Sequence, residues 1–98
     1  MAKGFRILSR RFTCPAGEID LVARRGRLLI FVEVKSRADL TVAGQAITAT
    51  QQRRISRAAG AFLQGRADLA GLDLRFDAVL FGRGGWPTHV TDAWRPIG

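Results

Sequence analysis

The chain has 98 residues, with 16 lysines and arginines against eight acidic residues, which gives a formal net charge of +8. This length suits one domain over residues 1–98, and a hydrophobic content of 47% excludes wholesale disorder. No apolar run is long enough to span a membrane, and one cysteine with one histidine excludes an internal disulfide or a Cys/His zinc site. We therefore expect a cytoplasmic protein whose partner is a polyanion, nucleic acid rather than a membrane.

The first third of the sequence predicts three strands, at residues 5–12, 18–24 and 28–36. A turn signal at residues 14–17 separates the first two strands. The second and third strands are joined by a tight turn, which we place at Arg25-Gly26, so they form an antiparallel hairpin.

The rest of the sequence predicts a loop over residues 37–47, a helix, and two further strands at 74–81 and 88–93. Thr48 and Gln51 have the spacing of a capping box, which begins a helix that ends near Leu63. Its buried side is expected to hold Ile47, Ile55, Ala58, Ala59 and Phe62. The resulting order predicts the α/β class, a mixed sheet with a flanking helix.

The hairpin gathers carboxylates. Strand alternation places Glu18, Asp20 and Val22 on one face of the second strand, and Glu33 shares a face with Lys35 on the third. With the turn at Arg25-Gly26, Glu18 lies opposite Glu33 and Asp20 lies diagonal to it. A slip of one residue would separate the acids onto two faces.

Like charges that face each other destabilise a sheet, so the carboxylates need a positive centre. Lys35 supplies part of this charge, and oxygen ligands from two or three carboxylates suit Mg²⁺ or Mn²⁺. In the other interpretation, Glu18 and Glu33 are solvated and Lys35 simply pairs with one of them. The residues alone leave both interpretations open.

Asp20, followed after twelve residues by Glu33-Val34-Lys35, resembles the Asp…(Asp/Glu)-x-Lys core of restriction-endonuclease-like nucleases. Further segments make the resemblance specific to the YraN family of small bacterial proteins, which resemble archaeal Holliday-junction resolvases. The segments are KGFRIL (3–8), GEIDLVAR (17–24), FVEVKSR (31–37), QRRI (52–55) and RFDAV (75–79). Family members usually carry an amphipathic helix before the first segment, and we expect that helix to be absent here.

The resemblance implies a restriction-endonuclease-like fold and a metal-dependent endonuclease that acts on DNA, with branched DNA as a candidate substrate. Asp20 and Glu33 would ligate Mg²⁺ or Mn²⁺ together with the Val34 carbonyl. Lys35 would lie beside the attacking water, lowering its pKa or stabilising charge on the phosphate. Glu18 would be an outer ligand or would only shape the start of its strand.

Phosphate contacts are expected from arginines, which supply affinity independent of sequence. The residues expected to make them are Arg37, Arg53, Arg54 and Arg57. The alternative is a catalytically inactive nucleic-acid-binding module of the same fold. Resolvase-like relatives suggest a homodimer.

A few polar and aromatic residues remain. Gln45 or Gln52 is a candidate for orienting water or a phosphate, although a surface amide is the simpler interpretation for each. Asp77 lies within an apolar strand, where we expect it to make structural hydrogen bonds. The remaining side chains, Cys14, Trp86, His89 and Trp94, are expected to pack or to lie exposed.

Overall fold

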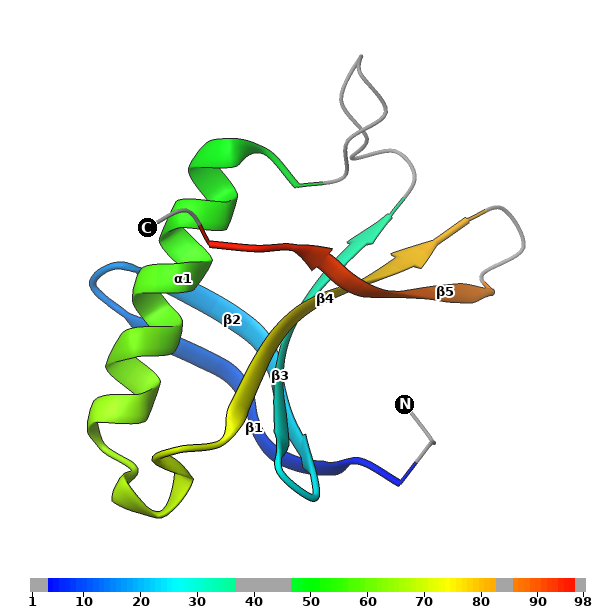
Figure 1. The fold of residues 1–98 in the computed structure, drawn as a ribbon. Coiled ribbons are helices and arrows are strands. Elements are labelled where there is room, and N and C mark those ends of the chain that lie inside the picture. The colour runs from blue at the N-terminus through cyan, green and yellow to red at the C-terminus, as the bar shows by residue number, and fades with distance from the viewer. Residues whose placement is uncertain (1–3, 37–46, 83–85, 97–98) are drawn as a thin grey trace.

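The computed structural model describes residues 4–36, 47–82 and 86–96. Within these residues the protein has an α/β fold, a five-stranded mixed sheet with one α-helix against it (Figure 1). In chain order the elements are β1 (Arg6–Cys14), β2 (Gly17–Arg25), β3 (Leu28–Ser36), α1 (Ala49–Gln64), the 3₁₀ turn η2 (Ala67–Leu69), β4 (Asp73–Phe81) and β5 (Pro87–Trp94). This architecture confirms the predicted fold class and is consistent with a restriction-endonuclease-like fold.

The order of the strands in the sheet follows their order in the chain, from β1 to β5. All neighbouring strands are antiparallel except β3 and β4, which run parallel from the Leu28/Asp73 pair to the Ser36/Phe81 pair. A parallel pair needs a crossover connection, and α1 lies in the segment that provides it. The predicted loop over residues 37–47 falls almost wholly on residues outside the described ranges.

Helix α1 begins where the capping box predicts. The Gln51 amide donates to Thr48 Oγ1 at 3.1 Å, and the Thr48 amide donates to Gln51 Oε1 at 2.9 Å. Both bonds satisfy backbone or side-chain groups that would otherwise lack a partner at a helix end. All the apolar residues predicted for the inner side are buried, namely Ile47, Ile55, Ala58, Ala59 and Phe62. The helix therefore confirms the prediction at its start and on its inner face.

The core has two parts, one on each face of the sheet. On the helix side, Phe31 packs against Phe62 and Phe76, with ring centroids 6.2 Å and 5.4 Å apart. On the other face, a smaller cluster forms around Ile30 and Val32. Strand β3 contributes to both parts and is fully buried from Leu29 to Val32, which explains its continuous apolar run. In the described part of the chain, no helix is long and apolar enough to cross a membrane.

The turn between β2 and β3 lies one residue later than the sequence suggested. Arg25 pairs with Leu28, so the central turn residues are Gly26 and Arg27 instead of Arg25 and Gly26. Gly26 has a φ of 59°, whereas Arg27 is not among the residues with positive φ. Glycine with positive φ at the first central position is typical of a type II′ hairpin turn, and this preference selects the observed frame.

Candidate active site

The five-stranded sheet divides between β2 and β3. These strands are paired from their turn as far as Leu21 and Val32. Beyond this pair, β2 remains paired with β1 and β3 remains paired with β4. Figure 1 shows the two halves diverging on either side of this point. We call this point the sheet fork, and Asp20 and Glu33 are the first residues past it.

The backbone of β2 is disturbed at the fork. Ile19 and Val22, which alternation would place on opposite faces, both belong to the helix-side core. On β1, the residue facing this stretch is Arg11, which has a φ of 53°, a left-handed conformation unusual for a residue with a side chain. The simple alternation predicted for β2 is therefore wrong between Ile19 and Val22, where Asp20 lies.

The Asp20 carboxylate reaches across the fork to β3. Its Oδ2 atom accepts a hydrogen bond from the Val34 amide at 2.8 Å, in place of a backbone bond between the two strands. The amide and the carbonyl of a strand residue point to the same side. The Val34 carbonyl is consequently directed toward the fork as well.

Glu33 completes a carboxyl pair with Asp20. Burial raises the pKa of Glu33 to about 8, with further increases from a hydrogen bond to the Asp20 carboxyl and from the Asp20 charge. Lys35 lowers this pKa and Glu18 raises it, both through electrostatic interactions alone. The structure thus brings Asp20 and Glu33 into contact and leaves Lys35 and Glu18 nearby. It corrects the predicted register, in which Glu18 faced Glu33.

The donor atoms at the fork fit a hard divalent cation. Two carboxyl groups and the Val34 carbonyl are oxygen ligands of the kind that Mg²⁺ and Mn²⁺ prefer, and Mg²⁺ commonly keeps several waters beside one or two carboxylates. Without a cation, the carboxyl pair holds a proton near neutral pH, as the raised pKa of Glu33 indicates. Within the described residues, no group of three or more His, Cys, Asp or Glu side chains is placed to hold a metal. Among the described side chains, these two carboxyls are the ones that could hold a cation at the fork.

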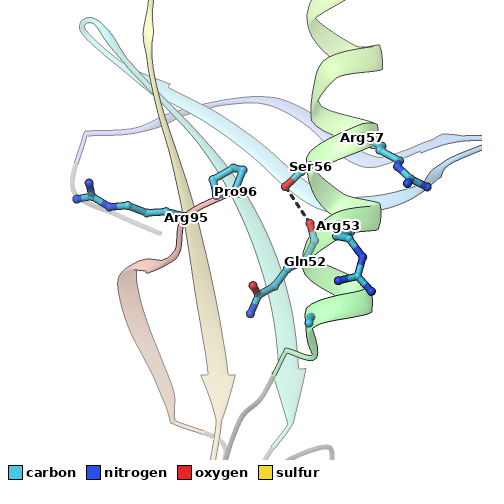
Figure 2. Close-up of a pocket in the computed structure, with 7 residues that line it drawn as sticks. Gln52, Arg53, Ser56, Arg57, Arg95 and Pro96 are labelled. Carbon is cyan, nitrogen blue, oxygen red and sulfur yellow. Dashed lines mark hydrogen bonds between the residues drawn. The ribbon is translucent and has the colours of Figure 1, made fainter. Parts of the chain in front are cut away.

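A basic surface lies along α1, whose sequence contains three arginines and no acidic residue. Arg53, Arg54 and Arg57 are all exposed. Figure 2 shows Arg53 and Arg57 projecting from the same side of the helix, beside a hollow of about 550 Å³ between α1 and the segment after β5. The turn between β1 and β2 lies close to the helix at Arg54. A Cβ atom added to Gly17 in this turn would lie 3.5 Å from Arg54 Cβ. The helix arginines are available to a ligand.

Three other residues were expected to contact a phosphate or water. Arg37 and Gln45 lie outside the described residues. The Gln52 side chain donates to the Ile47 carbonyl at 3.2 Å, so it helps to hold the start of α1.

A buried polar cluster on β4 and β5 was only half predicted. Asp77 is fully buried and accepts two hydrogen bonds from Arg75 at 2.8 Å and one from the Asp92 amide at 3.0 Å. His89 Nε2 lies 2.7 Å from Asp77 Oδ2. Burial acts to raise the pKa of Asp77, but the bonds from Arg75, Asp92 and His89 outweigh it and hold the pKa below its ordinary value. The structural role predicted for Asp77 is confirmed, whereas His89, expected merely to pack or lie exposed, is its partner.

The fold and the fork define a class of protein: an α/β domain consistent with the restriction-endonuclease-like fold, with a carboxyl pair where its central strands separate. The profile of the uncharacterised protein family UPF0102 matches residues 1–81. The chain belongs to this family, which is also called the YraN family, as its sequence motifs indicated.

Several relatives match most of the chain. UPF0102 proteins of Parvibaculum lavamentivorans and Rhodopseudomonas palustris strain HaA2 are each 53% identical over 94 residues, which cover 96% of this chain and 71% and 73% of the relatives. A UPF0102 protein of Methylorubrum extorquens is 50% identical over 94 residues, with 96% of this chain and 73% of the relative covered. These similarities establish the family.

Proposed function

We propose that this protein is a metal-dependent endonuclease that hydrolyses DNA phosphodiester bonds at the sheet fork. The observation that carries the proposal is the contact between the Asp20 and Glu33 carboxyls at the point where β2 and β3 separate. Two carboxyls in contact at neutral pH are unfavourable unless a proton or a cation lies between them. A cation at this position, in a protein with a net charge of +8, is suited to a phosphate substrate.

Asp20, Glu33 and the Val34 carbonyl are the groups that would hold Mg²⁺ or Mn²⁺. Such an ion, when bound, acts as a Lewis acid on a phosphoryl oxygen and favours ionisation of water. The Val34 amide already fixes Oδ2 of Asp20 at 2.8 Å, so this carboxylate is oriented before any ligand arrives. An oriented ligand reduces the entropic cost of binding.

Lys35 supplies the positive charge next to the carboxyl pair. Its interaction with Glu33 shows that the two charges are close enough to affect each other. A lysine ammonium in this position stabilises the negative charge that develops on the phosphate in the transition state. The exposed arginines Arg53, Arg54 and Arg57 on α1 would hold the DNA backbone, as would Arg37. We propose branched DNA as the substrate, by analogy with resolvase-like nucleases.

One observation favours a second candidate, a nucleic-acid-binding module without turnover. The described residues place two carboxyl side chains at the fork but no third acidic or histidine ligand. Ion binding and basic surface would remain in such a module, but cleavage would be lost. The two candidates therefore differ in one measurable property.

The test is cleavage of labelled linear, flapped and four-way DNA in the presence of Mn²⁺ or Mg²⁺. The parent is compared with Glu33→Gln and with Asp73→Asn, which removes an exposed carboxyl at the start of β4. We expect cleavage by the parent and by Asp73→Asn, and none by Glu33→Gln. Binding without cleavage in all three would select the binding module, and equal cleavage by all three would show that the fork is not the active site.

A further inference from the structure

Two arginines face each other at the start of the sheet. Arg6 on β1 and Arg24 on β2 are direct cross-strand partners in the antiparallel ladder. Directly opposed side chains of like charge destabilise a sheet, since their Cβ atoms are only about 5 Å apart. Among the described residues, Arg6 makes no hydrogen bond or ion pair, and Arg24 donates through Nε to the Gly26 carbonyl at 2.9 Å. The terminal nitrogens of Arg24 remain available for another acceptor.

These arginines line an open hollow of about 340 Å³. Its described lining consists of Gly4, Arg6, Arg24, Arg25 and Gly26, and includes no acidic side chain. The glycines add no side chain that would block the approach of a ligand. The Arg25 guanidinium lies over the Phe5 ring, 4.4 Å from its centroid, which fixes the position of a third positive charge.

One acidic side chain interacts electrostatically with Arg24, and it is already paired with another arginine. Arg24 acts on the Asp68 carboxylate, but Asp68 accepts two hydrogen bonds of 3.1 Å from Arg66. Among the described residues, neither Arg6 nor Arg24 forms an ion pair with an acidic side chain. An anion would relieve the repulsion between Arg6 and Arg24 and use their free donors.

We infer that this hollow, the arginine hollow, binds a backbone phosphate of the DNA whose cleavage we propose at the sheet fork. The inference rests on the proposed function for the identity of the ligand. The hollow is open and built from flexible arginine side chains instead of an enclosing ring of amides, which suits a phosphodiester on a long polyanion. It is separate from α1, whose arginines were expected, together with Arg37, to contact the phosphates.

The distance to the fork indicates which part of the DNA reaches the hollow. Arg24 and Asp20 lie four residues apart on β2, about 13 Å at about 3.3 Å per strand residue. B-DNA advances about 3.4 Å per base pair, so this distance corresponds to about four base pairs. The hollow would therefore contact the duplex arm beside the cleavage site.

The experiment measures binding of a fluorescein-labelled DNA duplex in EDTA, so that no cleavage is needed for the result. The parent, Arg6→Gln and Arg24→Gln are titrated at several salt concentrations. Arg66→Gln is the matched control, because it removes the same charge from a guanidinium that is occupied by Asp68. Each lost phosphate contact should reduce the slope of log K against log salt by about 0.9.

We expect this reduction for Arg6→Gln and Arg24→Gln and not for Arg66→Gln. Equal slopes for all four proteins would overturn the inference, while the nuclease proposal would stand or fall on the Glu33→Gln cleavage assay alone. If the three variants all reduce the slope equally, the effect is one of net charge and the inference also fails.

A second measurement needs no DNA. Because Arg6 and Arg24 repel each other, Arg6→Gln should raise the melting temperature at low salt, and Arg66→Gln should not. Inorganic phosphate distinguishes the source of the ligand. If millimolar phosphate raises the melting temperature of the parent but not of Arg6→Gln, while the salt slopes of DNA binding are equal, the site serves free phosphate and the inference of a DNA contact is wrong.

Discussion

Replacing Glu33 with glutamine should change how the stability of the protein depends on pH. The Glu33 carboxyl has an ordinary pKa of 4.5, which the folded protein raises to about 8. Between these two values the folded chain retains a proton that the unfolded chain has released. This proton uptake stabilises the fold at low pH, and the contribution is lost as the pH rises through 8. Glu33→Gln has no such proton and should lack this part of the pH dependence.

The size of the effect follows from the shift. At about 1.36 kcal/mol per pKa unit, a change from 4.5 to about 8 corresponds to about 5 kcal/mol of unfolding free energy. Glu33 is only partly buried, and solvent screens its interactions. We therefore expect the free energy of unfolding of the parent, relative to Glu33→Gln, to fall by about 2 kcal/mol between pH 4.5 and pH 8.5.

Urea denaturation followed by circular dichroism, without divalent metal, measures this difference at each pH. The control is Asp73→Asn, which removes an exposed carboxyl at the start of β4 that does not act on Glu33. Its stability should follow that of the parent across the range. If the parent and Glu33→Gln keep a constant difference from pH 4.5 to pH 8.5, Glu33 does not hold a proton in the folded protein, and our account of the carboxyl pair is wrong.

Three further outcomes test the site and the fold. Mn²⁺ should raise the melting temperature of the parent at pH 8 but not that of Asp20→Asn, and an equal rise in both would place the ion elsewhere. Lys35→Ala should retain DNA binding yet lose about 10²–10³ in cleavage rate at matched occupancy, and an unchanged rate would remove Lys35 from the reaction. Asp77→Asn should cost about 3 kcal/mol in urea denaturation, because Arg75 loses its buried carboxylate, and a cost below about 1 kcal/mol would contradict the role assigned to Asp77.

The elements of the fold could be predicted because their signals are local. The capping box at Thr48 and Gln51 lies within one helical turn, and the apolar run of β3 reports its burial on both faces. The contact between Asp20 and Glu33 was also predicted. The observed turn lies one residue later than the predicted turn, which moves each cross-strand partner by two residues, so Asp20 and Glu33 stay on the same face.

Other features depend on contacts between distant segments. The broken alternation around Asp20 accompanies the left-handed conformation of Arg11, which lies on β1. This conformation is usually indicated by a glycine in the sequence, and position 11 is an arginine. The contact of His89 with Asp77 depends on the register of β5 against β4, which pairs Ala78 with Val90 and Val79 with His89. Neither the sequence spacing nor the residue types determine which residue of β5 meets Asp77.

The strand order also has a consequence for the kinetics of folding. The first three strands follow one another along the chain and along the sheet, so their pairing needs only short loops to close. In contrast, Leu28 on β3 and Asp73 on β4 pair only after the intervening segment, α1 included, has folded back. The entropy of closing this loop is lost before the parallel contacts form, which slows folding. We therefore expect the joining of β4 to β3, with α1 packed on the sheet, to set the folding rate.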